Sequence, residues 1–400
     1  MARSGAHLPM RVAVVTETYP PEVNGVAITL QRMLEGLRAR QHVLQLVRLR
    51  QHADDLAQRG VGFDEVLMRG VPIPCYRYLR MGLPCTQALQ RLWSTQRPDV
   101  VHIATEGPLG WSALRAARRL ALPVVSDFRT NFHAYSRYYG AGWLQRPIAA
   151  GLRAFHNRTL CTMVPTPALQ RELAALGFAN LRVVARGVDT ARMHPSKRSE
   201  SLRRLWGAGA DTVVVLCVSR LATEKNIALL WRAFQAVAQR GVDARLVLVG
   251  EGPLRPQLQA LCRGAHFAGV RRGEDLAAHY ASADLFVFPS LTETFGNVVP
   301  EAMASALPVV AFDHAAAGQL IRHGDSGWLA APNDAAQFVE RVVGAASDRA
   351  ALQTAGSQAR RAALALDWAR VIDDLEAVLR RAMAQVEPNQ SPLLLRPSST

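Results

Sequence analysis

Two glutamates, Glu293 and Glu301, are separated by seven residues in the stretch DLFVFPSLTETFGNVVPEAMASALP. The pattern predicts a buried strand at 285–288, a short polar loop, and a helix whose first turn begins near Asn297 and Val298. Glu293 would then precede the helix and Glu301 would lie about one turn into it. We expect both carboxylates to face the crevice at the carboxyl end of the strand, where open α/β sheets bind ligands.

The loop between the two glutamates offers hydrogen-bond donors. Backbone amides of Gly296, Asn297 and Val298, preceded by Phe295, would point at the same crevice, and the amino terminus of a helix favours an anion. Taken alone, these residues also fit an ordinary strand-turn-helix unit with two solvated glutamates, because an E-x7-E spacing is a weak pattern.

Two cations follow another predicted strand, in CVSRLATEKN. Arg220 and Lys225 would lie at the same edge of the sheet as Glu293, where they suit a diphosphate. At 4 Å and an effective dielectric near 20, each ion contact is worth about 4 kcal/mol before desolvation, so the pair can replace a metal ion. The alternative is a pair of exposed loop charges with Glu224 partnering one of them. The chain contains no D-x-D pair, and we expect no metal site.

Two further strand ends belong to the same predicted edge. Gly250, in LVLVGEGPL, lacks the third glycine of a dinucleotide fingerprint but would let a ligand approach the backbone. Val270 and Arg271 follow HFAGV and are placed to meet a nucleobase through main-chain groups, although an ordinary exposed loop fits equally well.

Apolar runs alternate with amphipathic helical segments in both halves of the chain, which predicts doubly wound parallel sheets. We expect an amino-terminal Rossmann-like domain at 1–190, a polar linker, and a second Rossmann-like domain at 200–365. A helix at 366–385 would pack back on the first domain, and 386–400 would form a loose tail.

The net charge and the apolar runs of the chain indicate which partners the protein attracts and where in the cell it resides. The net charge of +15 implies attraction to polyanions such as an anionic membrane surface, nucleic acid or phosphorylated molecules. The chain starts without the apolar segment of a signal peptide, and no apolar run is long enough to span a bilayer. We therefore expect a cytoplasmic protein, either free or peripheral on the inner face of the membrane.

Three separated motifs, NGV, SRL-x3-K and E-x7-E with its P-E-A-M continuation, resemble those of the retaining nucleotide-sugar glycosyltransferases of family 4. The resemblance covers residues 11–385. It implies the GT-B fold, in which two Rossmann-like doubly wound domains face a central cleft. The segment TEGPLGWSALRAARRLALPVVSDFRTNF looks most like the mannosyltransferases that act on lipid-linked acceptors.

By this resemblance, Glu293 would bind hydroxyls of the donor sugar and Glu301 the ribose. Arg220 and Lys225 would grip the diphosphate, and amides near Gly25 and Phe295 to Val298 would complete its cage. The Asn24-Gly25 pair is also simply a good turn. The resemblance further implies retention of the α configuration by front-side attack, in which the departing phosphate oxygen takes the acceptor proton.

One position departs from the family pattern. Many relatives carry a histidine where this chain has Arg129, just before Thr-Asn-Phe. His133 or His102 would enter the site instead, or Arg129 would contact phosphate. Aromatic residues mixed with arginines in FRTNFHAYSRYYGAGWLQR and PCYRYLRMGLP suit a membrane interface, a sugar-bearing acceptor or packing within the domain.

These features together predict a hexosyltransferase that moves mannose from GDP-mannose, or a hexose from a UDP-sugar, to a lipid or glycan acceptor. No cofactor beyond the nucleotide sugar is expected. A sugar phosphorylase of the same fold is the alternative enzyme. A nucleic-acid-binding protein ranks lower, because the basic residues are scattered and no recognition element is evident.

Overall fold

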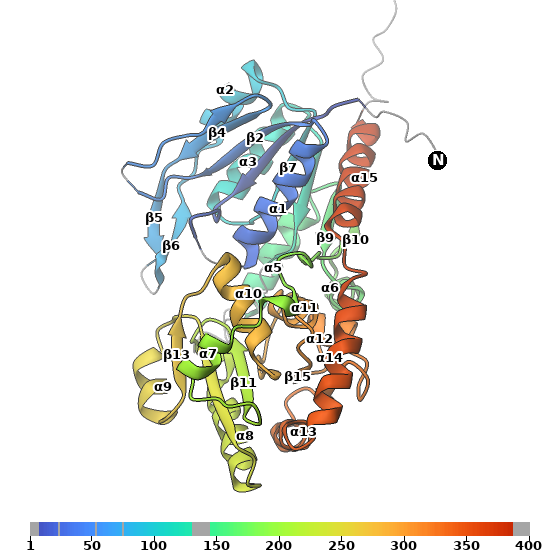
Figure 1. The fold of residues 1–400 in the computed structure, drawn as a ribbon. Helices are drawn as coiled ribbons and strands as arrows, with labels where there is room; N and C mark the ends of the chain where they lie inside the picture. Colours follow the sequence, from blue (N-terminus) through green and yellow to red (C-terminus); the bar gives the residue numbers. More distant parts are fainter. Residues whose placement is uncertain (1–7, 23–24, 53, 74–75, 130–144, 387–400) are drawn as a thin grey trace, which may run out of the picture. The chain divides into compact units, whose positions relative to one another are not determined.

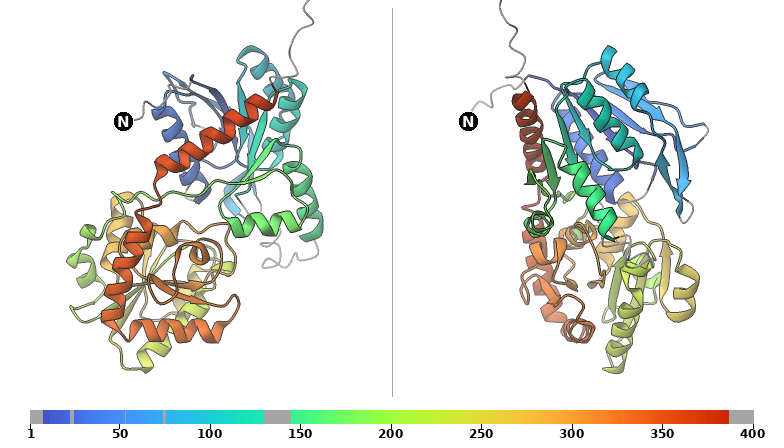
Figure 2. Two further views of the ribbon diagram at one scale, coloured as in Figure 1. Left: turned by 90° about the vertical axis from the view of Figure 1, so that its right-hand side faces the viewer. Right: turned by 180° about the vertical axis from the view of Figure 1, so that it is seen from behind.

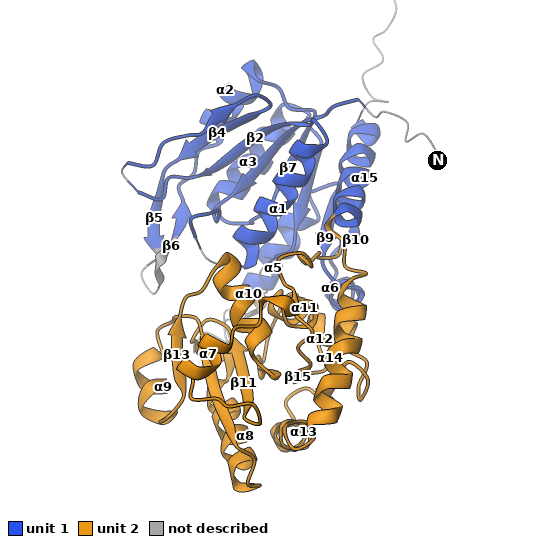
Figure 3. Cartoon of the chain, in the orientation of Figure 1, with its two compact units in different colours: residues 1–130, 147–184, 369–400 blue, residues 131–146, 185–368 orange. Residues whose placement is uncertain are grey.

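The structure is a computed structural model that describes residues 8–22, 25–52, 54–73, 76–129 and 145–386. The chain divides into two compact units (Figure 3). Unit 1 comprises residues 1–130, 147–184 and 369–400, and unit 2 comprises 131–146 and 185–368. Each unit is built around its own parallel sheet, as the alternation of apolar runs and amphipathic helices predicts.

Unit 1 contains an eight-stranded sheet in the order β10-β9-β8-β7-β1-β2-β4-β3 (Figure 1). All neighbours pair in parallel except β3 and β4. A separate antiparallel hairpin, β5–β6, leaves the sheet after β4. The strands are β1 (Arg11–Thr16), β2 (Val43–Leu49), β3 (Arg59–Gly60), β4 (Phe63–Met68), β5 (Gly70–Ile73), β6 (Tyr76–Gly82), β7 (Val100–Ile103), β8 (Val124–Asp127), β9 (Cys161–Val164) and β10 (Leu181–Val183).

The helices of unit 1 bury apolar residues against this sheet. Residues of α2, α3 and α5 share one apolar core with β1, β2, β7 and β8, and this core includes the fully buried Trp93. Helix α15 packs against α1, and it also contacts the β9–β10 edge of the sheet (Figure 2). The helices are α1 (Gly25–Ala39), α2 (Thr86–Thr95), α3 (Pro108–Arg119), α5 (Gln145–His156), α6 (Pro167–Ala175) and α15 (Trp368–Val386).

Unit 2 contains a six-stranded parallel sheet in the order β13-β12-β11-β14-β15-β16. Its two faces support separate apolar cores, one with α8 and α13 and the other with α10, α11 and α14. The strands are β11 (Val213–Val218), β12 (Ala244–Val249), β13 (His266–Gly269), β14 (Leu285–Phe288), β15 (Val309–Phe312) and β16 (Gly327–Ala330). The helices are α7 (Glu200–Leu205), α8 (Ile227–Gln239), α9 (Arg255–Leu261), α10 (Gly273–Ser282), α11 (Val298–Ala304), α12 (Ala315–Leu320), α13 (Ala335–Ala346) and α14 (Arg349–Ala363).

The polar stretch expected to link the domains lies within unit 2. It contains a 3-10 turn at Pro195–Lys197, and Lys197 forms a 2.8 Å ion pair with Glu274 at the start of α10. The chain returns to unit 1 at residue 369, and α15 occupies the helical region expected at 366–385. Residues 387–400 of the expected tail lie outside the described residues.

Glycine and charge together hold α15 against α1. A Cβ at Gly36 would lie only 2.5 Å from Ile372 Cγ1, so the absence of a side chain permits this close helix contact. Glu376 accepts hydrogen bonds from Arg40 (3.0 Å) and Arg380 (2.6 Å). Burial of Glu376 favours its neutral form, but these two bonds and the charges of His42 and Arg380 together outweigh burial and lower its pKa to about 2. The carboxylate is therefore ionised wherever the protein is folded near neutral pH.

The substitution Gly36→Ala should destabilise unit 1 by about 1–3 kcal/mol, as overpacking usually does. Ile372 is β-branched and stiff at χ1, so its Cγ1 cannot turn aside freely. Gly151→Ala in α5 is the matched control, because no atom lies within 4 Å of its Cβ position. It should stabilise the unit by about 0.5–1 kcal/mol through helix propensity. Urea denaturation measures both, and equal stability of the two variants would contradict the contact.

Candidate active site

The strand order of unit 2 places a topological switch point between β11 and β14. The chain proceeds from β11 to β12 on one side, and β14 later pairs on the other side of β11. In open α/β sheets, ligands bind in the crevice outside the carboxyl ends of two such strands. The loop after β11 carries Arg220 and Lys225, and the loop after β14 carries Glu293. The fold therefore brings the predicted residues to one edge.

Lys225 and Glu293 form an ion pair between Nζ and Oε1, and their side chains are only 10% and 12% exposed. Ser290 Oγ donates to the same Oε1 at 2.8 Å and lies 3.4 Å from Lys225 Nζ. The ammonium also lies 5.5 Å from the centre of the Phe288 ring. Two residues from two loops, Lys225 and Ser290, thus fix the carboxylate, which has little hydration of its own.

Arg220 is partly exposed and is paired with Glu224, which is the alternative arrangement considered from the sequence. Its Nη2 contacts Glu224 Oε1 at 2.5 Å, and the Arg220 side chain is 41% exposed while Glu224 is fully buried. The carbonyl of Glu224 also accepts the amide of Leu291 at 2.9 Å, which ties the loop after β11 to the loop after β14. The guanidinium therefore lies at the same edge as Lys225, but each cation already has a carboxylate partner.

Glu301 lies in the first turn of α11, which begins at Val298 as predicted. Tyr280 on α10 is fully buried and donates its hydroxyl to Glu301 Oε2 at 2.9 Å. Burial raises the pKa of Glu301 to about 7, and the Tyr280 bond opposes this rise. Sequence reasoning missed Tyr280, since it occupies the apolar face of a helix and nothing in its spacing distinguishes it from a core residue.

The loop between the two glutamates has the shape that a backbone-lined site requires. Gly296 adopts φ +90°, a left-handed conformation that side-chain-bearing residues rarely take. Phe295 is buried, and its carbonyl accepts the amide of Ala316 at 2.8 Å. Asn297 precedes α11 without a side-chain cap. His314, after β15, is a second residue that sequence reasoning missed. Burial lowers its pKa, while the nearby charge of Glu293 raises it.

The other residues predicted to bind the donor follow β12 and β13. A Cβ at Gly250 would lie 1.9 Å from the carbonyl oxygen of Ser219, so this glycine permits a close approach between two strand ends. Val270 is 44% exposed. Arg271 donates to the Ala268 carbonyl at 2.9 Å and to Asp275 at 3.1 Å, which fixes its side chain beside α10.

Three of the residues predicted in the first half, Gly25, His102 and Arg129, lie in unit 1. Gly25 begins α1, and its carbonyl accepts the Thr29 hydroxyl at 2.7 Å. Arg129 Nε donates to Asp127 Oδ2 at 2.9 Å, and His102 Nε2 lies 2.6 Å from that same oxygen. All three side chains are nearly inaccessible to solvent. His133 lies outside the described residues.

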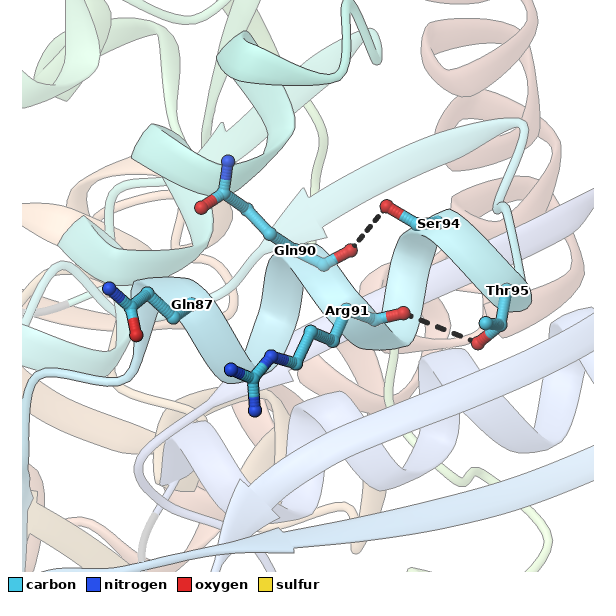
Figure 4. A pocket seen from close by; sticks show the side chains of 5 residues that line it. All are labelled: Gln87, Gln90, Arg91, Ser94 and Thr95. Atoms are coloured by element: carbon cyan, nitrogen blue, oxygen red, sulfur yellow. Dashed lines mark hydrogen bonds between the residues drawn. The ribbon is translucent and has the colours of Figure 1, made fainter.

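Other potential sites are few within the described residues. These hold no group of three or more His, Cys, Asp or Glu side chains that could bind a metal ion. No helix among them has both the length and the apolar character needed to cross a bilayer. A polar pocket on the exposed side of α2 involves none of the predicted site residues (Figure 4); it is lined by Gln87, Gln90, Arg91, Ser94 and Thr95.

Comparison with known proteins identifies relatives of both halves. Residues 23–192 match the family described as Glycosyltransferase Family 4, and residues 212–348 match Glycosyl transferases group 1. A GDP-mannose-dependent alpha-mannosyltransferase of Mycobacterium tuberculosis is 36% identical over 94% of this chain and 99% of its own length. The enzyme of the same name from Corynebacterium glutamicum is 34% identical over 84% of this chain and 80% of its own length.

The fold of this chain also resembles that of solved structures. Sucrose-phosphate synthase from Thermosynechococcus elongatus superposes with a TM-score of 0.77 at 18% identity, covering 94% of this chain and all of that one. The predicted GT-B architecture, with two parallel-sheet α/β units, is therefore confirmed. The conclusion rests on the sequence identity over nearly the full length and on the two matching family descriptions, and the fold agrees with it. The chain belongs to glycosyltransferase family 4 and is a hexosyltransferase.

Proposed function

We propose that the protein is a retaining, metal-independent α-mannosyltransferase that uses GDP-mannose and a lipid-linked or glycan acceptor. The observation that carries the proposal is the convergence of Lys225 and Glu293 at the switch point of unit 2. The relatives of highest identity reported above are named GDP-mannose-dependent alpha-mannosyltransferases, which favours GDP-mannose over a UDP-hexose.

In this proposal, Lys225 links the carboxylate that binds the donor sugar to the diphosphate of the donor. An ammonium has three N–H donors, so Lys225 can hold Glu293 and a phosphate oxygen at once. Glu293 keeps a second oxygen for hydroxyls of the donor sugar. Arg220, at the solvent-facing side of the same edge, provides the second cation for the diphosphate. Amides of the loop from Phe295 to Val298 complete the anion site.

The nucleoside end of the donor would lie toward Glu301. Tyr280 occupies Oε2 of that carboxyl, which leaves Oε1 for the ribose hydroxyls. Gly250, Val270 and Arg271 border the same edge and would offer main-chain groups to the base. The family resemblance assigns Gly25, at the start of α1, to the diphosphate and Arg129 or His133 to the reacting centre.

The transfer step conserves atoms and charge without a general base from the protein. The bond from the anomeric carbon to the phosphate oxygen breaks, and the bond to the acceptor oxygen forms on the same face. The proton of the acceptor hydroxyl passes to the departing phosphate oxygen. Because the leaving diphosphate gains negative charge as its bond breaks, fixed cations stabilise the transition state more than the ground state.

A basic face of unit 1 supports the proposed anionic membrane surface as a partner and a peripheral location on the cytoplasmic membrane. Helices α2, α3 and α5 contain no Asp or Glu. Helix α3 meets the segment after α5 at Trp111. The guanidinium carbons of Arg115 and Arg158 lie 5.8 and 5.7 Å from the centre of the Trp111 ring. Arg119 donates to Gln90 of α2 at 3.2 Å. The exposed arginines of the three helices are Arg91, Arg115, Arg118, Arg119, Arg146 and Arg153.

The proposal is tested by assaying GDP-mannose and UDP-glucose with a lipid extract as acceptor in the presence of EDTA. We expect an α-linked mannolipid and GDP release that persists in the chelator. Glu293→Gln should lower the rate of transfer by about 100-fold or more, equivalent to roughly 3 kcal/mol of transition-state stabilisation. Glu274→Gln, an exposed ion-pair partner in unit 2, is the control and should retain activity. A β-linked product, or full activity of Glu293→Gln, would contradict the mechanism.

Tyr280→Phe tests the orientation of Glu301. Loss of the hydroxyl removes one charge-assisted hydrogen bond, so GDP affinity should fall by roughly 10-fold while the aromatic packing remains. A GDP analogue without ribose hydroxyls should bind both proteins equally, since its affinity does not depend on Glu301. Titration calorimetry gives the four affinities. An equal loss for both ligands would show that Tyr280 acts on the fold rather than through the ribose contact.

The membrane surface is tested by a triple change on α3, Arg115→Gln, Arg118→Gln and Arg119→Gln. Each basic residue near an anionic bilayer contributes about 1 kcal/mol, so vesicle binding should weaken roughly 100-fold. Sedimentation with phosphatidylglycerol vesicles measures this, and phosphatidylcholine vesicles should bind little. The control changes three exposed arginines of unit 2 to glutamine: Arg204, Arg240 and Arg263. Equal losses in both sets, or tighter binding to RNA than to vesicles, would contradict the assignment.

A further inference from the structure

Unit 1 has a switch point of its own, between β1 and β7. Strand β1 pairs with β2 on one side and with β7 on the other, although β7 follows much later in the chain. The crevice rule that places a ligand at the edge of unit 2 therefore applies here as well. Glu17 comes directly after β1, and Glu106 lies in the loop after β7.

Two carboxylates at this edge already have structural partners. Glu17 Oε1 accepts the amide of Leu109 at 2.9 Å and that of Gly82 at 3.2 Å, so it joins α3 to the β5–β6 hairpin. Asp127, at the end of β8, is held by Arg129 and His102. These contacts satisfy the half-buried Glu17 and the buried Asp127, and neither acid needs a ligand for its hydrogen bonds.

Glu106 differs from its neighbours. The residue is 7% exposed, and its Oε1 has no hydrogen-bond partner among the residues that the structure describes. Leaving a buried polar atom unsatisfied costs about 1–3 kcal/mol, and native proteins do this rarely. Such an atom at the switch point of a parallel sheet is best explained by a ligand that supplies the missing hydrogen bond.

The charges around Glu106 indicate the class of that ligand. Glu17 and Asp127 lie close enough to act on the Glu106 carboxyl, and Arg129 is the cation that opposes them. Three carboxyl groups against one guanidinium disfavour a phosphate or another anion. A neutral sugar or polyol hydroxyl fits, since it can donate to Oε1 and accept from a protonated carboxyl.

We propose that Glu106 binds a hydroxyl of the acceptor at the β1–β7 switch point of unit 1. The inference rests on the proposed function, in which unit 2 binds the donor and unit 1 the acceptor. Glu106 is then a specificity-determining residue that selects and orients the attacking sugar or polyol, while the donor site remains independent of it.

The ionisation of Glu106 gives the proposal a pH dependence. Burial, together with the charges of Glu17 and Asp127, raises the pKa of Glu106 to about 8, and a hydrogen bond from its own backbone amide and the charge of Arg129 oppose this rise. His102 contacts Asp127, one of the two acids that act on Glu106. Below pH 8 the carboxyl is neutral and can donate to a hydroxyl oxygen. Above pH 8 it ionises beside two other acids and loses that donor, so the acceptor KM should rise.

The experiment compares Glu106→Gln and Glu106→Ala, with a total lipid extract of the producing cells as the acceptor probe. Glutamine imitates the neutral acid, so Glu106→Gln should stay within about 3-fold of wild type at pH 7 and lose the rise in KM between pH 7 and 9. Glu106→Ala should raise the acceptor KM at least 10-fold. Slow hydrolysis of GDP-mannose, in which water replaces the acceptor, should be unchanged in both variants, as should the affinity for GDP.

Glu172→Ala, an exposed glutamate of unit 1, is the matched control and should behave as wild type. An unchanged acceptor KM in Glu106→Ala, or a wild-type pH profile in Glu106→Gln, would overturn this inference while leaving the proposed function intact. A wild-type protein that binds GDP but transfers no mannose would overturn the proposed function and this inference with it. Equal losses of acceptor and donor binding in Glu106→Ala would show a structural role instead.

Discussion

The ion pair of Lys225 and Glu293 is the interaction on which the proposed donor site depends. Each side chain is about nine-tenths buried, so neither charge is well hydrated and each stabilises the other. Ser290 supports the same carboxylate oxygen, and the bond from the Leu291 amide to the Glu224 carbonyl joins the two loops. The parallel sheet makes this possible, because the carboxyl ends of β11 and β14 adjoin only where the strand order reverses.

The two switch points of the chain share a topology and differ in charge. In unit 2 the edge between β11 and β14 pairs two cations with two carboxylates, which gives a diphosphate fixed positive groups without an excess of charge. In unit 1 the edge between β1 and β7 carries Glu17, Glu106 and Asp127 against Arg129. An anion is favoured at the first edge and disfavoured at the second. The surplus positive charge of the protein lies elsewhere, and part of it lies on α2, α3 and α5, which contain no Asp or Glu.

The sequence was sufficient for features that are local or periodic. Strands buried on both faces appear as continuous apolar runs, so β11, β12, β14 and β15 were predictable, and the E-x7-E spacing placed Glu293 before α11 and Glu301 within it. Contacts between distant residues were not predictable. Tyr280 meets Glu301 because α10 and α11 pack on the same face of the sheet, and Gly250 is required by the approach of Ser219. Glu106 has no motif of its own, and among the described glutamates it is distinguished by a buried side chain whose Oε1 has no hydrogen-bond partner.

The proposed retaining mechanism would need no further acid or base than those found at the two switch points. If the departing phosphate oxygen takes the acceptor proton, no carboxylate must act as a base beside the anomeric carbon, and an ionised acid placed there would repel the leaving diphosphate. The negative charge of Glu293 is offset by its ion pair with Lys225, which reduces its repulsion of the diphosphate. Glu106 stays neutral near pH 7, because burial and two neighbouring acids raise its pKa to about 8. A carboxyl in that state can orient an acceptor hydroxyl without taking its proton, which leaves the proton for the phosphate.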